Sequence, residues 1–480
     1  MDASTNYLGL SDNAVLLLAA NLASIPQLSS LRDLIAGYPD VLHFTAVLEI
    51  LLKIVPETTS PEDYVPIVYH SYRREIGQFD MSRISTSAVD EVQQLSTQNV
   101  KRRLTAFDLQ PTPKSHPHAE EDEKLLTQWF FDRARRVEEA TGMIDLARRL
   151  VLPDTTNFSQ DPAFPPSAVT AWGKGVVQVL ETFIFDNDDE DELQLLPFEN
   201  LDPDSAIRLL MSRSTPDIIA RNVKTLIIPF IDYIRSKEPN RQLWATLWDW
   251  LLDKASAGEL SFISNLTGDW VPDDETVLRQ FLQTCLTASY LCHQTSSSIR
   301  QNLRRIQQNI LRLSQILPLP ESQPIVLHHP ETDLLPSQLR ESSSLTTLSR
   351  TSLTFLDQII QSADVVAQYH GSPDMSLRDI IMIREGPEPA QSQLLDRLLR
   401  SEQTWNKRND EQWRKLRQSL KWLHNQSRVL GKISDQSLDT RIFTAMLDAT
   451  GISIEDLAYS SIYFSEGDVC SDKGITSRSS

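Results

Sequence analysis

The amino-acid sequence predicts an all-α fold, an elongated α-solenoid of stacked helical hairpins. Apolar residues recur at three- and four-residue spacing in short runs, and prolines or glycines separate these runs. Glycine is scarce at 14 of 480 residues, while the 26 prolines are near the usual share of about 5%. Repeated Asn-Gly or Asp-Gly pairs, which signal β-hairpins, are missing from the sequence. Many helices joined by short turns are therefore expected.

The first two helices are well delimited. The first begins with an N-cap at Ser11 or Asp12 and stops at Pro26. The second begins at Leu28 and is expected to end with a glycine C-cap at Gly37. Between these limits the apolar residues follow the spacing of one helix face.

A third helix is expected to open at Asp40 and to end at Pro56, and Ser60 with Pro61 starts a fourth. An isolated amphipathic helix of this length is marginal in water, so these helices must bury their apolar stripes against each other. Because short breaks favour antiparallel neighbours, stacked helical hairpins are the simplest arrangement. A compact helical bundle is the alternative.

The central part of the chain continues the helical pattern. A helix is predicted from Leu125 to about Leu150 and is broken at Gly142. Further along, Pro229 lies inside an apolar pattern, which predicts a kink or a stop at Ile228. The core side of the first of these helices is expected to hold Trp129, Phe130, Val137 and Met143.

Residues 277–317 predict the longest helical element. Its apolar residues alternate at spacings of four and three, as in the seam of a coiled coil, over roughly two to three heptads. This is too short for a convincing coiled coil, so we interpret the segment as a long solenoid helix, with a helix that captures a partner helix as the alternative. The seam residues are Ile299, Leu303, Ile306, Ile310, Leu313 and Leu317.

The order of helical, proline-rich and polar stretches predicts six segments along the chain. They are N-terminal helical hairpins over 1–110, an exposed loop over 111–124, a central α-solenoid over 125–317, a Pro- and Ser-rich linker or loop over 318–352, C-terminal helical hairpins over 353–450, and a frayed tail over 451–480.

The charge balance restricts the classes of partner. Lys and Arg total 46 against 65 Asp and Glu, which gives a net charge of -19. Such a surface repels phosphate backbones and argues against nucleic acid as a partner and against direct adsorption to anionic lipid. No stretch approaches the roughly 18 apolar residues of a membrane span, and Met1 to Ser4 lack the basic start of a signal peptide. The three cysteines, Cys285, Cys292 and Cys470, fit a reducing cytosol.

No catalytic, cofactor or metal motif is recognised, so the chain is not expected to be an enzyme and no residue is nominated for such a role. His116 and His118 lie in a proline-rich stretch without nearby cysteines, which favours solvated side chains over a metal site. Lys174 lies between two glycines, but Val176 follows Gly175, and this does not fit a P-loop.

Two further features have ordinary structural explanations. The acidic run 186–192 lacks the glycine and the final glutamate of a calcium loop, so a solvated linker is favoured. The segment around Trp244, Trp248 and Trp250 is the most aromatic of the chain and is expected to pack in the core. Tryptophan is also enriched at binding hot spots, so an exposed Trp248 would instead indicate a partner contact.

Three blocks of residues occur in a recognisable order. The first holds Leu10-Ser11, Val15 to Ala19, Leu31 to Leu34, Pro39 to Leu42, Leu51-Leu52, Val55 to Glu57 and Tyr64 to Pro66; the second holds Trp129-Phe130, Arg133 to Arg136 and Thr141-Gly142; the third holds Pro165-Pro166 and Trp172 to Val177. Together they resemble the secretory-pathway Sec39 family, the fungal counterpart of the animal neuroblastoma-amplified-sequence protein. The resemblance extends roughly from residue 8 to 450, and its positions are packing and turn residues.

The resemblance implies a subunit of the Dsl-type tethering complex, called NRZ in animals, which captures COPI-derived Golgi vesicles and supports SNARE assembly in retrograde transport to the endoplasmic reticulum. It implies a cytoplasmic chain, peripheral to the endoplasmic-reticulum membrane, whose N-terminal end receives a SNARE regulatory helix bundle and whose C-terminal end contacts another tether subunit. Residues 451–480 depart from the family, whose members usually continue through further helices. The alternative is an α-helical repeat scaffold of another cytosolic assembly, such as a coat or pore subunit.

Overall fold

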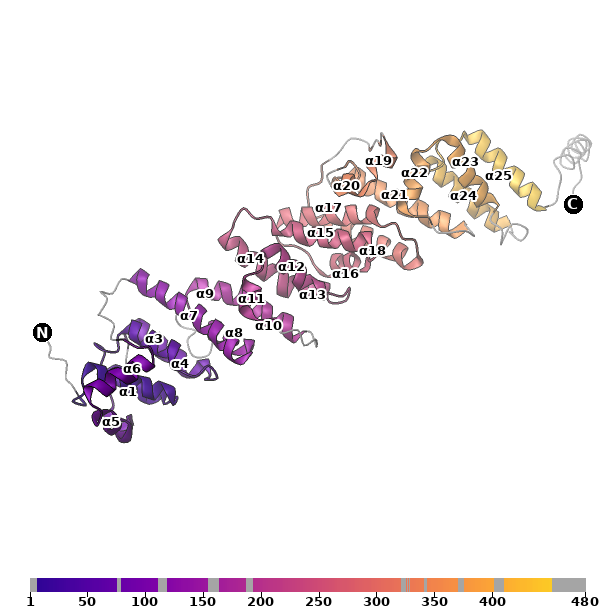
Figure 1. Cartoon of the computed structure of the whole chain (residues 1–480). Helices are drawn as coiled ribbons and strands as arrows, with labels where there is room; N and C mark the ends of the chain where they lie inside the picture. Colours follow the sequence, from indigo (N-terminus) through magenta and orange to yellow (C-terminus); the bar gives the residue numbers. More distant parts are fainter. Residues whose placement is uncertain are drawn as a thin grey trace, which may run out of the picture. The chain divides into compact units, whose positions relative to one another are not determined.

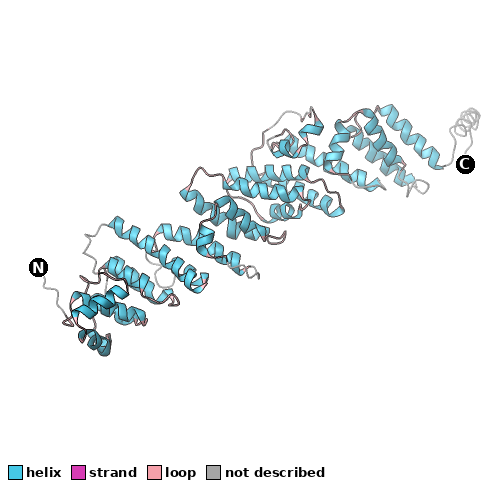
Figure 2. Ribbon diagram, in the orientation of Figure 1, coloured by secondary structure: helices cyan, strands magenta, loops and turns pink. Residues whose placement is uncertain are grey.

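The computed structural model describes residues 7–75, 79–110, 119–153, 164–186, 193–320, 325, 327, 329–340, 343–369, 375–400 and 410–450. Every regular element in these ranges is a helix, as Figure 2 shows, so the predicted all-α fold is confirmed. Outside the described residues lie His116, His118, Cys470, residues 187–192 of the acidic run and the predicted tail 451–480.

The helices form two compact units. Unit 1 comprises Met1–Ser214 and Arg221–Leu243, and unit 2 comprises Thr215–Ala220 and Trp244–Ser480. Within each unit, helices pack on near neighbours in the chain (Figure 1), which is the packing that a solenoid of helical hairpins requires. The predicted elongation and the predicted segment boundaries stay predictions.

Unit 1 begins with a group of short helices and continues through longer ones. Its elements are α1 (Asp12–Ser24), α2 (Leu28–Gly37), α3 (Phe44–Lys53), α4 (Pro61–Arg73), the 3-10 turn η1 (Met81–Arg83), α5 (Thr86–Gln93), α6 (Thr97–Ala106), α7 (Ala119–Thr141), α8 (Ile144–Val151), α9 (Ser167–Trp172), η2 (Gly173–Val177), α10 (Gln178–Phe185), α11 (Leu195–Glu199), α12 (Pro203–Ser212), α13 (Ile219–Asn222), η3 (Val223–Ile227) and α14 (Ile228–Lys237).

Apart from Thr215–Ala220, unit 2 consists of the chain from the tryptophan-rich helix onward, and the first residue of that helix, Leu243, still belongs to unit 1. The elements of unit 2 are α15 (Leu243–Ser256), α16 (Ser261–Asp269), α17 (Glu275–Leu291), α18 (Ser297–Ser314), α19 (Pro330–Asp333), α20 (Pro336–Arg340), α21 (Arg350–Tyr369), α22 (Leu377–Glu385), α23 (Glu388–Leu399), α24 (Asp410–Asn425) and α25 (Asp435–Thr450). Among their contacts, α18 packs on α16, α17 and α21, and α21 packs on α22 and α24.

Helix α1 is the centre of the N-terminal group. Ser11 is its N-cap, as predicted, and the backbone N–H of Val15 donates to the Ser11 carbonyl at 2.9 Å. Every side chain from Ala14 to Ala20 is buried, because α2, α3, α5 and α6 surround the helix. A helix that is apolar on all sides is expected to lie inside such a group rather than on its surface.

One predicted helix start in this group is wrong, and one predicted helix end is correct but differs in its cap geometry. Helix α3 begins at Phe44 instead of Asp40, because the backbone N–H of Leu42 donates to the carbonyl of Tyr38 and closes a turn there. Gly37 is the last residue of α2 and not a left-handed C-cap; the next residue, Tyr38, donates its N–H to the last turn of the helix instead.

The predicted break at Gly142 is confirmed. This glycine adopts a φ of +68°, which separates α7 from α8. Met143 is 45% exposed and does not belong to the core, because it caps α8 instead of lying on the buried face of α7. The other predicted core residues, Trp129, Phe130 and Val137, are buried.

Two π-helical turns interrupt long helices of unit 1. The turn η2 joins α9 to α10, and η3 joins α13 to α14. A kink or a stop was predicted at Ile228. The stop is wrong, because the helix continues through Pro229, and the irregularity that precedes this proline is the π turn of η3. Proline has no N–H to donate and its ring clashes with the carbonyl of the preceding turn. A wider π turn relieves this clash without ending the helix.

The predicted long helix over 277–317 is two helices, α17 and α18. The first ends at Leu291, and the second starts after Ser296, whose hydroxyl accepts from the backbone N–H of Ile299 at 3.2 Å as an N-cap. All six seam residues, from Ile299 to Leu317, are buried. The seam therefore packs inside unit 2, which favours the solenoid helix over the partner-capturing helix.

The Pro- and Ser-rich segment 318–352 contains the short helices α19 and α20, which contact α22 and α17 respectively. Four of its leucines are buried, which shows that the described part of the segment packs on the helices of unit 2. These leucines are Leu334, Leu339, Leu345 and Leu348.

Candidate interaction surfaces

The described residues contain no group of three or more His, Cys, Asp or Glu side chains that could hold a metal ion. Among them no helix is long and apolar enough to cross a membrane. Cys285 and Cys292 are buried free thiols, as expected, and burial raises the pKa of both, which keeps them protonated and unreactive.

The tryptophan-rich segment forms a core cluster. Trp248 is 7% exposed and stacks between Trp244, at 5.4 Å between ring centroids, and Phe281 of α17, at 5.6 Å. Trp270 stacks on Trp244 at 5.8 Å and closes the cluster. Core packing is thus confirmed for Trp248, and its role as an exposed partner contact is excluded.

Helix α7 holds the N-terminal helices of unit 1 through two polar side chains. Trp129 donates its indole N–H to the carbonyl of Leu48 at 2.9 Å. Arg133 is 0% exposed, donates to the carbonyl of Pro56 at 2.9 Å and lies over the ring of Tyr64. The carbonyl of Leu48 lies inside α3, and that of Pro56 lies beyond its end, so α7 is bonded both to the helix and to the segment that follows it. The surface that α1 to α6 present is thereby fixed on α7.

One carboxylate joins three helices of unit 1. Glu199 of α11 accepts from Arg135 Nε of α7 at 2.8 Å and from Trp172 Nε1 of α9 at 2.6 Å. The hydrogen bond to Glu199 raises the pKa of Arg135. Arg135 from the second block of the sequence resemblance and Trp172 from the third therefore bind the same carboxylate.

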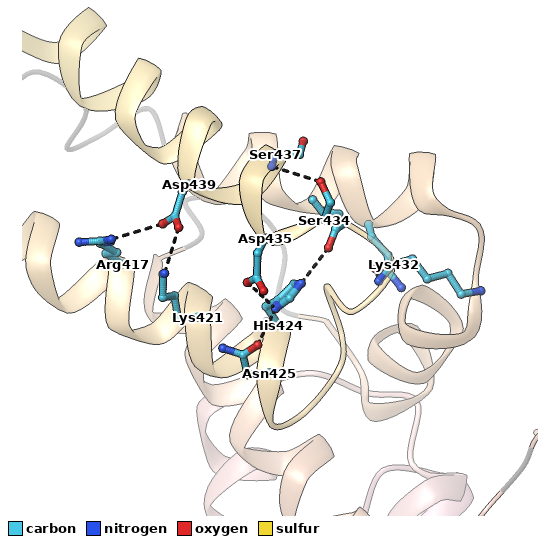
Figure 3. A network of polar contacts seen from close by, with 11 residues as sticks. Arg417, Lys421, His424, Asn425, Lys432, Ser434, Asp435, Ser437 and Asp439 are labelled. Atoms are coloured by element: carbon cyan, nitrogen blue, oxygen red, sulfur yellow. Dashed lines mark hydrogen bonds and ion pairs between the residues drawn. The ribbon is translucent and has the colours of Figure 1, made fainter.

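A basic, partly exposed helix face lies on α24. Arg414, Arg417 and Lys421 follow one another at helical spacing, next to the half-buried ring of Trp422, around a shallow groove of about 490 Å³. Asp439 of α25 accepts from Lys421 at 3.1 Å and from Arg417 at 3.4 Å, as Figure 3 shows. The hydrogen bond from Lys421 lowers the pKa of this carboxyl group.

The loop between α24 and α25 is held by His424 and Lys432 (Figure 3). One ring nitrogen of His424 lies 2.8 Å from the carbonyl of Ile433, and the other lies 2.8 Å from Asn425 Oδ1 and 3.5 Å from Asp435 Oδ1. Lys432 donates to the carbonyls of Glu385 and Gly386 at 2.8 Å and 2.7 Å. These bonds fix the position of α25, and with it Asp439, beside the basic face.

A second basic feature lies on α6 in unit 1. Lys101 and Arg102 are exposed, while Arg103 pairs with Glu91 of α5 at 2.9 Å. Helices α5 and α6 bury Val89, Val92, Val100 and Leu104 and turn their polar faces outward.

A groove of unit 1 runs between its two interrupted helices. It has a volume of about 560 Å³ and is lined from one side by Ala171, Lys174, Gln178 and Thr182, and from the other by Lys224, Thr225, Ile228, Pro229, Asp232, Tyr233 and Ser236. Sequence reasoning did not find this groove. Lys174 was noted only for its glycine neighbours, although the spacing of 171, 174, 178 and 182 is that of one helix face.

Large exposed apolar side chains are scattered over the described elements. Examples are Tyr7, Ile25, Phe185, Ile316 and Phe443, each more than half exposed and each on a different element or loop. Single exposed apolar residues are normal and do not mark a binding site.

Comparison with protein families gives a match that spans most of the chain. The family model described as secretory pathway protein Sec39 matches residues 16–467. The chain belongs to the Sec39 family. A search of curated proteins finds no match. Family membership gives a role in the secretory pathway, and Sec39 is a family of secretory-pathway proteins rather than of enzymes.

The Sec39 match also explains the nature of the three sequence blocks. Trp129, Arg133, Arg135 and Trp172 lie within the matched residues, and each of them donates hydrogen bonds between helices. These residues serve the packing of the Sec39 fold. Residues that contact partners must be sought on the exposed faces between them.

Proposed function

We propose that this Sec39-family chain is a subunit of a vesicle-tethering complex that acts in Golgi-to-endoplasmic-reticulum retrograde transport. In this role it is a scaffold that binds endoplasmic-reticulum SNAREs and other tether subunits. Its contact with COPI vesicles is indirect, through these partners. The observation that carries the proposal is the family match over residues 16–467. The stacked helices and the exposed helix faces of both units support it, because helical repeats offer extended surfaces to other helices.

The proposal includes a cytoplasmic location, peripheral to the endoplasmic-reticulum membrane. The net charge of -19 disfavours direct adsorption to anionic lipid, so attachment depends on partner proteins. We assign SNARE binding to the N-terminal helices and the contact with a tether subunit to the C-terminal helices. Lys101 and Arg102 on α6 and the basic face of α24 are the charged surfaces with which we test this assignment.

The experiment is an affinity purification of the tagged full chain from cell lysate, with endoplasmic-reticulum SNAREs and tether subunits quantified by mass spectrometry. Two charge-reversal variants are compared. Lys101→Glu with Arg102→Glu changes α6, and Arg414→Glu with Gln418→Glu changes α24 without touching the ion pairs of Asp439.

The α6 variant should lose SNAREs and keep tether subunits, and the α24 variant should do the opposite, so each serves as the control for the other. Deleting residues 1–110 is a poorer test, because it removes the helices against which Trp129 and Arg133 are buried. Recovery of neither class of partner by the unchanged chain contradicts the tethering role.

A further inference from the structure

The groove of about 560 Å³ between η2–α10 and η3–α14 has the dimensions of a helix-binding site. Its lining on one side extends from Ala171 to Thr182, which corresponds to about 16 Å along a helix, or roughly three turns. On the other side it extends from Lys224 to Ser236. Two parallel walls of this length form a trough that a third helix can occupy.

The π turns keep both walls of the trough continuous. On the second wall Lys224, Ile228, Asp232 and Ser236 are each four residues apart. In a regular α-helix such positions drift by about 40° at each step, because a turn holds 3.6 residues. The wider turn of η3 offsets part of this drift and helps keep the four side chains on one line.

Small side chains and a glycine shape the floor of the trough. Gly175 is the point of closest approach, because a Cβ there would lie 2.2 Å from Tyr233 Cβ and 3.0 Å from the carbonyl oxygen of Pro229. Ala171 and Ser236 leave room above this contact, and Ile228 adds apolar surface. The glycine therefore lets the two walls pack closely on each other beneath the trough, at a distance typical of packed helices, about 8–10 Å between axes.

The charges of the trough are arranged along its length. Lys174 belongs to η2, which packs on α14, whereas Lys224 belongs to η3, which packs on α10. The two helices are therefore antiparallel, and the lysines lie toward opposite ends of the trough. Asp232 lies on α14, nearer to Lys174, and burial raises the pKa of its carboxyl group.

We propose that this groove binds one amphipathic helix of a partner protein, about three turns long, with an acidic residue near each end. Lysines at both ends of a groove on a chain with a net charge of -19 favour an acidic guest over a basic one. Because Gly175 lies opposite Pro229 and Tyr233 in the antiparallel pair, Lys224 lies at about the level of Thr182, eight residues from Lys174. The two acidic residues are therefore about eight positions apart on the guest helix, since each residue rises about 1.5 Å. A small or apolar stripe between them faces Ile228.

This inference does not rest on the proposed tethering function. It concerns the middle of the chain, whereas the SNARE and tether contacts are assigned to the N-terminal and C-terminal helices. Loss of either of those contacts leaves the groove prediction intact, and failure of the groove prediction leaves them intact.

The test uses the full chain and two fluorescein-labelled synthetic helical peptides, titrated by fluorescence anisotropy. Both peptides have the same apolar stripe; one has glutamates eight positions apart and the other has lysines at the same two positions. We expect the glutamate peptide to bind about tenfold more tightly and to lose this advantage as salt is raised.

Two groove variants locate the binding. Lys174→Glu with Lys224→Glu should reverse the preference in favour of the lysine peptide, whereas Lys101→Glu with Arg102→Glu on α6 should leave it unchanged. Thr182→Trp fills the groove and should abolish binding of both peptides. Circular dichroism of each variant verifies that the helices are retained.

Three outcomes overturn the inference. The first is that the two peptides bind equally or that neither binds. The second is that the charge-reversal variant still prefers the glutamate peptide. The third is that sedimentation shows self-association of the chain through a surface that Thr182→Trp disrupts. The last outcome would assign the groove to a second copy of this chain.

Discussion

Trp172 donates its indole N–H to Glu199 Oε1 at 2.6 Å. The same carboxylate accepts two bonds from Arg135, at 2.8 Å and 3.2 Å, so α7, α9 and α11 meet at one buried acid. The side chain of Glu199 is only 13% exposed. Hydrogen bonds to an ionised and shielded acceptor contribute more to stability than exposed ones.

Glu199→Gln should destabilise unit 1 by about 1–3 kcal/mol. The amide keeps the size of the side chain but offers one acceptor oxygen where three N–H groups now point. Urea unfolding followed by circular dichroism measures the loss. Glu91→Gln is the matched control, because Glu91 pairs with Arg103 in an exposed bridge and should change stability by less than about 1 kcal/mol. Equal effects of the two substitutions would contradict a special role for Glu199.

Arg133→Met should cost about 1.5–3 kcal/mol, because it removes the charged donor from the carbonyls of Leu52 and Pro56 and leaves the Pro56 carbonyl with the N–H of Thr59 alone. Met fills most of the volume of the arginine stem, so the loss reports the missing hydrogen bonds more than a cavity. Arg136→Met, three residues along the same helix, breaks an exposed pair with Glu57 and should cost under about 1 kcal/mol. Thermal unfolding of the two variants distinguishes these values, and a smaller loss for Arg133→Met would refute the anchoring role.

Much of the fold could be predicted from the sequence because it depends on local signals. The spacing of apolar residues, the glycine at Gly142 and the N-cap at Ser11 act within one or two turns, and the structure confirms them. Two residues were misplaced. Met143 was expected in the core but is the N-cap of α8, and Asp40 was expected to begin a helix but lies in a turn. Both outcomes depend on packing between helices rather than on the local sequence pattern.

The candidate surfaces were less predictable for a physical reason. The groove requires Gly175 to face Tyr233, more than fifty residues away, and no periodicity in either helix alone encodes that pairing. The burial of Trp248 likewise depends on Phe281 of another helix. An apolar stripe has the same pattern whether it faces a neighbouring helix or a partner, so only the packed structure separates the two.

Trp248→Ala should destabilise unit 2 by about 3–5 kcal/mol, since it opens a cavity between Trp244 and Phe281. Trp422→Ala on the half-buried edge of α24 is the control and should cost clearly less, because solvent can fill the space that it leaves. Urea unfolding followed by circular dichroism compares them. A large loss for Trp422 and a small one for Trp248 would reverse the assignment of core and surface.

Glu138 makes the stability of unit 1 decrease as the pH rises. This side chain is 5% exposed, and burial raises its pKa, although the backbone N–H of Leu195 donates a hydrogen bond to it. Since the folded state holds the proton more tightly than the unfolded state does, stability from this residue is present below the unfolded pKa of about 4.3. It is lost as the pH rises from that value through the raised pKa of the folded state.

Glu138→Gln should therefore leave stability nearly unchanged near pH 4 and should raise it above the wild type at pH 7. The amide oxygen still accepts from Leu195, and the neutral side chain avoids placing a charge in the interior. Urea unfolding of both proteins at intervals between pH 4 and pH 8 gives the difference in free energy of unfolding, which should grow with pH and then level off. Glu123→Gln, on the exposed face of the same helix, should produce no such growing difference. If the wild type were more stable than Glu138→Gln at pH 7, the prediction would be wrong. That result would show that the surroundings stabilise the ionised carboxylate, whereas a raised pKa requires the wild type to be the less stable of the two.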